Sequence, residues 1–555
     1  MKNIDIDTSL LDFLRKSGIV EAQSLQESYS LAKQSGQTLA KVISDQGLVD
    51  DVILGQIVAD LYKLPFVQLS QISLPLDVLQ IVPEDFAQKH KLIAFAKNGT
   101  KLKVATSSPL QEPATIDWIK QKSNLPIELY YATDNDIVDA LLNYLGNLLT
   151  ELATSIAQAE VRPSDARPNI IELVDLLILY AYRSKASDIH IEPSENSTLI
   201  RFRVDGILHD VTTISANLFD QVITRIKVIS NLKIDEHFSP QDGSIPFLAD
   251  EKQIDIRVSI VPTTRGENIV LRLLSENIHE LSIHELGISA ANLQKIKSAY
   301  SKSRGMLLAS GPTGCGKTTT MYAILKLINK PELNIMTIED PVEYQIERIR
   351  QIQVNPAAGL TFAKGLRSII RQDPNVILVG EVRDQETADI AINAALTGHL
   401  VMSTFHTNDA ATVPARMSEM GVEAYLVASA LNSIVAQRLV RSLCRNCRVT
   451  HEITADEKKE IEKYFGSSIS ELSAYKGKGC SVCFNTGYRG RTGIFEVLET
   501  NKEIRKAITD KKDTQVIRDL AIKNGMQPLI EDGLNKVRQG ITSLDEILGI
   551  IKEVM

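Results

Sequence analysis

The chain has 555 residues, of which 44% are hydrophobic and 23% charged, the composition of a globular protein rather than of a disordered or fibrous one. Its 69 acidic residues exceed its 61 basic residues, and the formal net charge of -8 excludes a global positive field that would gather nucleic-acid phosphates. At about 100 to 200 residues per domain, this length predicts three or four domains.

The sequence offers no obvious route into or across a membrane. The most apolar stretches, 171–182 and 424–440, are interrupted by acidic and amide residues, and neither supplies the run of about 20 apolar residues that spans a bilayer. The first seven residues lack the basic start and apolar core of a secretory signal. We therefore expect a cytoplasmic protein without a transmembrane segment, whose thiols stay reduced.

Residues 1–65 have the pattern of short amphipathic helices and carry a weak internal repeat with a period of about 29 residues. Leu14 and Gly18 of the first copy match Ile43 and Gly47 of the second. Each glycine falls where a helix would end in a left-handed C-cap. The pattern predicts an N-terminal helical subdomain.

Residues 66–146 combine a strand-like run at 102–105 with helical runs at 115–122 and 136–145, which predicts an α/β subdomain. From residue 147 to 168 the composition shifts to Ala, Ser, Glu, Arg and Pro. Two prolines near the end of this segment disfavour a continuing helix. We expect the segment 147–168 to be a linker.

Two further domains follow the expected linker. Residues 169–285 begin with an apolar helix, Asp205-Gly206 supplies a hairpin turn, and runs with a period of two predict strands at 188–192, 199–204, 253–258 and 268–273. These features indicate a small α+β domain. From residue 286 to 555, apolar strands alternate with helical patterns, as in a parallel sheet covered by helices, and the last 50 or so residues are helical.

A glycine-rich loop lies between the apolar strand 306–309 and the helix 318–328. It has the pattern G-x-x-x-x-G-K-T and, with the residue that follows, consists of Gly311, Pro312, Thr313, Gly314, Cys315, Gly316, Lys317, Thr318 and Thr319. The glycines let backbone N–H groups wrap phosphates, and the helix N-terminus adds partial positive charge. We expect Lys317 to reach the β- and γ-phosphates of ATP and Thr318 to bind Mg²⁺.

Carboxylates stand at the ends of two other apolar strands. Glu381 ends one of them, in the arrangement that places a carboxylate beside Mg²⁺ opposite the phosphate loop. Another strand, which begins at Ile335, ends in Glu339, Asp340 and Glu343. One of these three is a candidate for positioning the attacking water, and a solvated acidic loop is the alternative.

Two histidines flank a further apolar strand. His399 precedes the strand and His406 follows it. Histidines in such places are commonly structural residues with satisfied hydrogen bonds. We expect His406, rather than His399, to contact the γ-phosphate.

Four of the five cysteines form two C-x-x-C pairs. Cys444 and Cys447 make the first pair, and Cys480 and Cys483 make the second. Two such pairs can close one tetrahedral Cys₄ site, typical of structural zinc, within a module at residues 440–490. An iron–sulfur cluster is the chemical alternative.

Four sequence blocks occur in one order along the chain: G-P-T-G-C-G-K-T, T-I-E-D-P-V-E, R-Q-D-P-N-V-I-L-V-G-E-V-R-D and T-G-H-L-V-M-S-T-F-H-T. Together they resemble the secretion ATPase superfamily of type IV pilus and type II secretion motors. The segments 186–194 and 201–206 match that family as well, so the resemblance covers about residues 170 to 500.

The resemblance implies a multidomain α/β protein with a RecA-like P-loop ATPase core, preceded by a PAS-like α+β domain and an N-terminal helical and α/β region. Carried over from the family, Glu343 is the water-activating carboxylate, Glu381 the glutamate on the Mg²⁺ side, and His406 the γ-phosphate sensor. Arg257 and Arg272 match the arginines that close on the γ-phosphate, and solvated strand arginines are the alternative for this pair.

The four-cysteine module and the long N-terminal region resemble pilus-extension and type II secretion ATPases more than retraction motors. The resemblance implies a homohexamer that docks on an inner-membrane platform protein, peripheral to the membrane, and powers type IV pilus assembly. A type II secretion motor is the alternative, followed by a DNA-translocating ATPase and a poorly hydrolysing regulator. The acidic balance argues against direct nucleic-acid contact.

Two positions depart from the family pattern. Cys315 stands where the family usually has Ser, which introduces an oxidisable thiol into the phosphate loop. Relatives that bind cyclic di-GMP carry repeats of the form R-L-G-x-x-L, whereas here the two copies begin Ser9-Leu-Leu and Thr38-Leu-Ala. We therefore expect weak or no binding of cyclic di-GMP.

Overall fold

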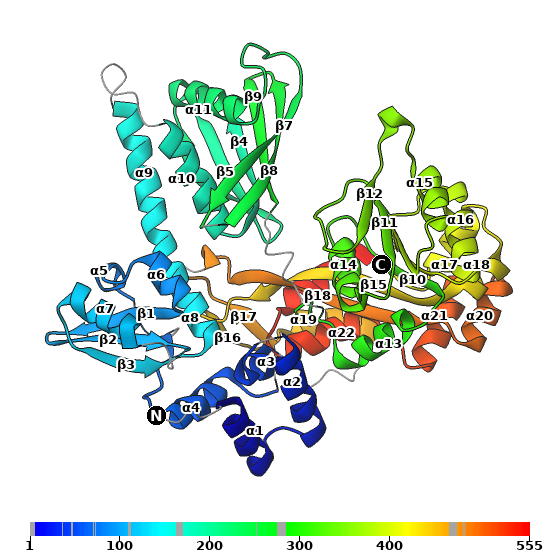
Figure 1. Ribbon diagram of the computed structural model, residues 1–555, viewed down its shortest axis with the longest axis horizontal. Coiled ribbons are helices and arrows are strands. Elements are labelled where there is room, and N and C mark those ends of the chain that lie inside the picture. The colour runs from blue at the N-terminus through cyan, green and yellow to red at the C-terminus, as the bar shows by residue number, and fades with distance from the viewer. Residues whose placement is uncertain are drawn as a thin grey trace. The chain divides into compact units, whose positions relative to one another are not determined.

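The chain divides into two compact units, Met1–Glu276 with the short segment Cys480–Asn485, and Asn277–Gly479 with Thr486–Met555 (Figure 1). The structure is a computed structural model. It describes residues 6–35, 37–45, 48–69, 72, 74–108, 113–161, 170–250, 252–274, 283, 285–465, 474–480 and 483–554.

The first unit begins with helices, as expected. These are α1 (Ile6–Ser17), α2 (Ala22–Ser35), α3 (Leu39–Asp45) and α4 (Asp51–Tyr62). Leu10, Leu14 and Ile43 lie in their shared core. Gly18 ends α1 with a φ of 66°, and its N–H donates to the Leu14 carbonyl, so the predicted left-handed C-cap is present. Gly47 lies outside the described residues.

A three-stranded sheet follows, with β2 paired antiparallel to β1 and parallel to β3. Its strands are β1 (Leu92–Asn98), β2 (Lys101–Thr106) and β3 (Ile127–Tyr131). The accompanying helices are α5 (Leu76–Leu79), α6 (Glu84–Lys89), α7 (Pro113–Ser123) and α8 (Asp134–Leu141). The mixed α/β character expected for this region is therefore present.

The segment expected to be a linker is helical over much of its length. A 3₁₀ turn, Leu142–Tyr144, leads into α9 (Leu145–Val161). Leu148, Leu152 and Ile156 are buried in one core with α10 (Ile170–Arg183). The linker prediction was wrong for these residues because apolar side chains four positions apart give the helix a face to bury. Residues 162–169 lie outside the described part of the chain.

A six-stranded antiparallel sheet completes the main part of the first unit, in the order β6-β5-β4-β9-β8-β7. Helices α10 and α11 (Ala216–Ile229) share a core with it (Figure 1). The strands are β4 (Ala186–Pro193), β5 (Thr198–Val204), β6 (Ile207–Ile214), β7 (Gln241–Ala249), β8 (Lys252–Thr263) and β9 (Gly266–Leu274). They include every strand predicted here.

A seven-stranded sheet forms the centre of the second unit, in the order β12-β11-β13-β14-β10-β15-β18. All neighbouring strands are parallel except β15 and β18. The strands are β10 (Gly305–Ser310), β11 (Ile335–Glu339), β12 (Arg350–Gln353), β13 (Val376–Val379), β14 (Leu400–Phe405), β15 (Leu431–Leu443) and β18 (Tyr488–Glu499).

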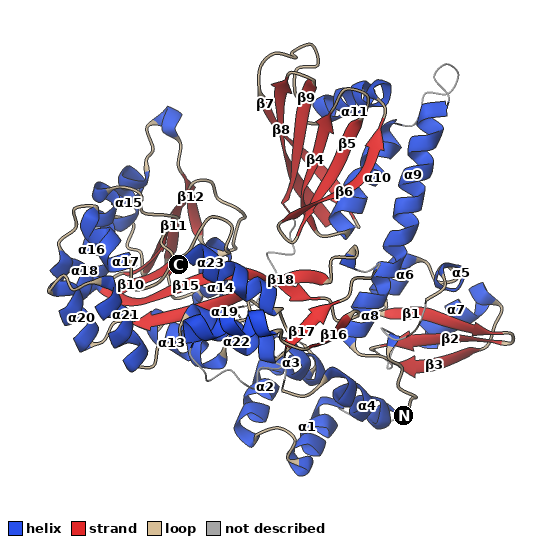
Figure 2. Ribbon diagram, turned by 180° about the vertical axis from the view of Figure 1, so that it is seen from behind, coloured by secondary structure: helices blue, strands red, loops and turns tan. Residues whose placement is uncertain are grey.

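Helices cover both faces of this sheet (Figure 2). Met306 and Leu308 of β10 belong to one core, with α15 (Phe362–Ile370), α16 (Gln385–Leu396), α17 (Val413–Glu419), α18 (Ala424–Ala430), α20 (Lys502–Thr509) and α21 (Thr514–Lys523). Leu307 and Ala309 belong to the other, with α13 (Ala290–Tyr300) and α14 (Lys317–Ile328). Burial on both faces explains why β10 is continuously apolar.

The remaining elements lie along β15 and β18. Helices α22 (Leu529–Arg538) and α23 (Leu544–Val554) share a core with Val440 and Ile494. Strands β16 (Arg448–His451) and β17 (Ala474–Gly477) form an antiparallel pair, with α19 (Ala455–Phe465) between them in the chain. Among the residues described, no helix combines the length and apolar content needed to cross a membrane.

Candidate functional site

Four of the predicted motifs meet at one edge of the seven-stranded sheet. They follow β10, β11, β13 and β14, which are adjacent and parallel, so their carboxyl ends point the same way. In open parallel sheets, ligands bind at that edge. The Gly380 N–H donates to the Ile338 carbonyl at 2.8 Å, and the Thr404 hydroxyl donates to the Gly380 carbonyl at 2.7 Å, which ties the three strand ends together.

The glycine-rich loop depends on glycine for its conformation. Gly311, Gly314 and Gly316 have φ values of 147°, 77° and 89°. A Cβ atom on Gly311 would lie 2.5 Å from the Cys315 sulfur and 2.6 Å from the Gln437 carbonyl oxygen. The backbone turn and the close approach of β15 therefore both require glycine at the start of the loop.

Lys317, the first residue of α14, is drawn into the loop. Its Nζ donates to the carbonyls of Gly311 at 2.8 Å and Pro312 at 2.9 Å. Burial lowers the pKa of Lys317, while the nearby Glu381 opposes that change. The remaining loop residues present an open surface for phosphates, because the exposed side chains are those of Pro312, Thr313 and Thr318, with Thr319 half-buried.

Cys315 is buried beneath the loop. It is 4% exposed, and burial raises the pKa of its thiol, although Lys317 and Arg438 oppose the rise. The thiolate rather than the thiol is the reactive form. Burial thus counteracts the oxidation sensitivity that the sequence suggested for this position.

Gln437 is a site residue that the sequence analysis missed. It lies on β15, is 2% exposed, and donates from Nε2 to the Cys315 carbonyl at 2.7 Å. Its Oε1 accepts from the Thr320 hydroxyl at 2.8 Å. Gln437 therefore holds the phosphate loop and the first turn of α14 from the neighbouring strand. The only sequence signal was an apolar strand pattern interrupted by two amides, Asn432 and Gln437.

Glu381 and His406 lie close together after β13 and β14. The Glu381 carboxylate pairs with the Arg383 guanidinium and lies 3.6 Å from His406 Nε2. Burial lowers the pKa of His406, Lys317 lowers it further, and Glu381 opposes both. The lowered pKa favours the neutral imidazole, which can donate a hydrogen bond to a phosphate. Arg383 was not singled out from the sequence.

His399 has a structural environment instead. Its Nδ1 is 2.9 Å from the carbonyl oxygen of Ala394, near the end of α16. The backbone N–H of His399 donates to the same carbonyl. This histidine therefore satisfies a carbonyl at the end of α16. That structural contact agrees with the expectation that His406, rather than His399, contacts the γ-phosphate.

The three carboxylates after β11 differ in accessibility. Glu339 is 2% exposed, accepts from the Thr337 hydroxyl at 2.5 Å and from the Tyr322 hydroxyl, and so faces the interior. Asp340 and Glu343 are exposed. Of the three, only Asp340 and Glu343 present a carboxylate to solvent.

Arg257 and Arg272 are direct cross-strand partners on β8 and β9 of the first unit. Like charges directly opposite each other are destabilising in a sheet. The cost is offset at Arg272, whose Nε lies 3.0 Å from Asp188 Oδ1 on β4. Two arginines on one sheet face form a cationic pair suited to an anion, and their approach to a γ-phosphate stays a prediction.

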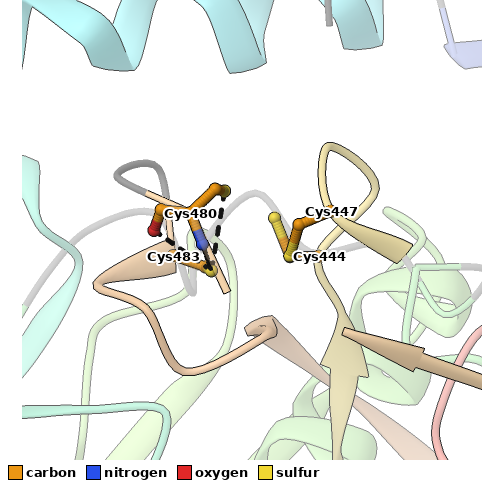
Figure 3. Close-up of side chains that lie close together, drawn as sticks. All are labelled: Cys444, Cys447, Cys480 and Cys483. Atoms are coloured by element: carbon orange, nitrogen blue, oxygen red, sulfur yellow. Dashed lines mark hydrogen bonds between the residues drawn. The ribbon is translucent and has the colours of Figure 1, made fainter. Parts of the chain in front are cut away.

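Cys444, Cys447, Cys480 and Cys483 form one group, with sulfur atoms all within 4.8 Å of one another (Figure 3). The Cys480 and Cys483 sulfurs are 3.6 Å apart. Tetrahedral zinc with Zn–S bonds of about 2.3 Å requires sulfurs separated by about 3.8 Å, so the group fits a tetrahedral metal ion.

The strands β16 and β17 bring the two cysteine pairs together. Arg448, just after Cys447, pairs with Gly477, which lies shortly before Cys480. A Cβ atom on Gly477 would lie 2.1 Å from the Gly487 carbonyl oxygen. Glycine at position 477 therefore allows the close approach of Gly487, whose carbonyl accepts from the Cys444 N–H at 2.9 Å.

Comparison with known proteins places the site in a family. Residues 164–549 match the model of the "Type II/IV secretion system protein" family, and residues 62–151 match the MshEN domain. The chain belongs to the type II/IV secretion system protein family. It is an ATPase with a RecA-like core, because this family and its relatives are secretion ATPases.

Two relatives of this secretion ATPase carry different names. It is 45% identical to the type II secretion system ATPase E of Vibrio cholerae over 405 residues, 72% of this chain and 79% of the relative. It is 34% identical to the type IV pilus assembly ATPase PilB of Myxococcus xanthus over 556 residues, 97% of this chain and 98% of the relative. The family is thus shared by pilus and secretion motors.

The fold of the secretion ATPase is also found in a solved structure. The ATPase DotB of Legionella pneumophila aligns with a TM-score of 0.52 at 21% identity, over 70% of this chain and 98% of DotB. This likeness concerns the fold alone. It agrees with the α/β architecture and central parallel sheet described above.

Proposed function

We propose that this ATPase acts as a homohexamer at the cytoplasmic face of the inner membrane and powers type IV pilus assembly through a membrane platform protein. The observation that carries the proposal is the meeting of four secretion-ATPase motifs at one sheet edge, in a chain that a PilB matches over 97% of its length. The contact with the membrane is made through partners.

At the nucleotide site, the loop from Gly311 to Thr319 binds ATP and Lys317 contacts its phosphates. Thr318 and Glu381 lie on the Mg²⁺ side. Support comes from the exposed side chains of the loop and from the position of Glu381. This residue follows β13, which pairs with β14, and β14 pairs in turn with β10, the strand that leads into the loop. The loop residues bind and orient ATP. Thr318 and Glu381 would hold Mg²⁺, which when bound would supply positive charge beside the phosphates.

Hydrolysis is assigned to Glu343, which orients and activates the attacking water, and to His406, which contacts the γ-phosphate. Glu343 is favoured over Glu339 because Glu339 is buried and engaged by Tyr322. Arg257 and Arg272, on the preceding domain, close on the γ-phosphate. Cations near the charge that develops there accelerate phosphoryl transfer. Domain closure and reopening would then couple hydrolysis to mechanical work.

The four-cysteine group is assigned to structural Zn²⁺. Thiolates are ligands that zinc prefers, and the spacing of the sulfurs suits a tetrahedral ion. The metal would hold β16, β17 and the two C-x-x-C pairs together. It has no role in ATP hydrolysis.

The nucleotide chemistry is tested by two variants of the purified chain. Lys317→Ala should lose ATP binding and hydrolysis, because the loop's ammonium is removed. Glu343→Gln should bind ATP normally but hydrolyse it about 100-fold more slowly, because the water is no longer activated. Steady-state phosphate release and binding of fluorescent ATP measure the two effects. If wild type is as slow as both variants, the motor proposal is wrong.

The type II secretion motor is the second candidate, favoured by 45% identity to the Vibrio cholerae ATPase over 72% of the chain. A deletion strain separates the two. Loss of surface pili with protein secretion intact supports pilus assembly. Loss of secretion with pili intact supports the second candidate.

A further inference from the structure

The loop that carries Glu343 is an unusually short connection between two parallel strands. It spans residues 340–349 and joins β11 to β12, which are parallel neighbours. Parallel neighbours are usually joined by a crossover of a dozen or more residues that contains a helix. This loop is shorter than that and has no helix of its own. Side chains from the surrounding elements must therefore hold Glu343 in place.

The side chain of Gln351, on β12, both accepts a hydrogen bond from the backbone of this loop and donates one to it. Its Oε1 accepts from the Ile346 N–H at 2.7 Å, and its Nε2 donates to the Tyr344 carbonyl at 3.0 Å. A backbone donor and a backbone acceptor on the same loop fix which end of the amide is oxygen. Gln351 is half-buried, whereas Gln353 on the same strand is exposed.

The same amide reaches the interior. Its Nε2 lies 3.3 Å from Glu339 Oε1 and 3.3 Å from the Tyr322 hydroxyl. Glu339 and Tyr322 are 2% and 0% exposed, and the Tyr322 hydroxyl donates to the Glu339 carboxylate. Buried polar groups that satisfy one another in this way form a rigid unit.

Tyr322 links this unit to the phosphate loop. It lies on α14, the helix that begins at Lys317. Its ring packs edge-on against Tyr344 of the loop, with centroids 4.7 Å apart. The loop that carries Glu343 is therefore fastened to the helix that holds the phosphates.

We infer that Gln351 is a positioning residue for ATP hydrolysis, which acts with Tyr322 and Glu339 to hold the Glu343 carboxylate at a fixed place relative to the phosphate loop. The inference rests on the proposed role of Glu343. Gln351 does not itself touch ATP. It acts through geometry, and misplacement of a reacting group by about 1 Å can cost about 100-fold in rate.

The test is Gln351→Met, which keeps the length of the side chain and removes its hydrogen bonds. In steady-state ATPase assays of the full chain, kcat should fall about 10- to 100-fold while KM for ATP stays within about twofold, because the phosphate loop is unaltered. The matched control is Gln353→Met on the same strand face. The Gln353 Oε1 accepts a long hydrogen bond of 3.3 Å from the Val342 N–H, so the kcat of the Gln353→Met variant should stay near that of wild type.

A wild-type kcat in Gln351→Met overturns the inference. So does an equal loss in both variants, which would indicate a general loosening of β12. A second variant, Tyr322→Phe, removes only a hydroxyl. It tests the inference independently if Gln351→Met lowers the unfolding temperature of the protein. It should lower kcat without raising KM, and a wild-type kcat there also overturns the inference.

A double-mutant cycle separates this inference from the proposed function. If Gln351 acts through Glu343, then Gln351→Met should change the residual rate of Glu343→Ala by less than about twofold. An equal fold-loss in both backgrounds means that Gln351 acts elsewhere and overturns the inference. A wild-type rate in Glu343→Ala alone would instead overturn the assignment of Glu343.

Discussion

Burial separates Glu339 from the other two carboxylates that follow β11. Glu339 is 2% exposed and is held by hydroxyl donors, whereas Glu343 lies on the exposed loop. A buried carboxylate that accepts several hydrogen bonds stabilises its surroundings but has no access to water. Two glutamates of one motif thus differ in their access to water because their environments differ.

His406 leads to a prediction about pH at the same scale. Its pKa lies below the ordinary value of about 6.5 because burial and Lys317 disfavour the imidazolium. The unfolded chain therefore binds this proton first as the pH falls, so the contribution of His406 to stability is constant above about pH 6.5 and decreases below it. We expect kcat/KM to be flat from about pH 7 to 8 and to decline in acid, where His406 becomes charged.

The pH profile of kcat/KM measures this decline, with His406→Gln as the comparison. The variant should be slower throughout and should lack the part of the acid decline that comes from His406. An acid midpoint above about pH 7 in wild type would contradict a lowered pKa.

At the scale of elements, the same local pattern can lead to different structures. The apolar stretch 424–440 becomes a helix, α18, followed directly by a long strand, β15. Periodicity does not distinguish a short buried helix from a buried strand, because both are apolar on all sides. Pairing with β10 and β18 decides the strand.

The strand pair β16 and β17 gives a prediction about metal. Wild type should contain about one zinc per chain, and Cys480→Ser should contain less than about half, because one of four ligands is lost. Binding of structural zinc is worth on the order of 10 kcal/mol to the fold of such a module, so the variant should also unfold at a lower temperature. Metal analysis and thermal unfolding are the measurements.

Cys315→Ser is the matched control for the metal, since it removes the one cysteine outside the group. It should keep its zinc. Equal zinc content in wild type and Cys480→Ser would contradict the assignment, and iron in place of zinc would favour the cluster alternative.

At the scale of the whole molecule, the N-terminal helices and α/β subdomain raise the question of a regulator. Residues 62–151 match the MshEN domain, and the two repeats that precede it, at Ser9 and Thr38, lack the arginines and glycines of the R-L-G-x-x-L pattern. Leu11 and Ala40 stand at the glycine positions, inside α1 and α3. A guanidinium fork is the group that best recognises a phosphate, so its loss removes the main anchor for a dinucleotide.

We therefore predict that cyclic di-GMP binds with a dissociation constant weaker than the micromolar range. Isothermal titration calorimetry on the full chain measures it, with ATP binding as the positive control for folded protein. Micromolar or tighter affinity for cyclic di-GMP would show that other residues replace the missing arginines.

The sequence by itself determined the features that depend on neighbouring residues. The phosphate loop between β10 and α14, the alternating strands of the six-stranded sheet and the two C-x-x-C pairs were all predicted, because turn geometry, side-chain period and ligand spacing are local properties. Family resemblance then supplied roles for Glu343, Glu381 and His406.

Only the tertiary structure decided which residues support those features. Gln437 holds the phosphate loop because β15 pairs with β10, and Gln351 holds the Glu343 loop because β12 pairs with β11. Residues 147–161 form a helix because α10 covers their apolar face. Each outcome depends on contacts between segments that are separated along the chain, and a local sequence pattern contains no information about such contacts.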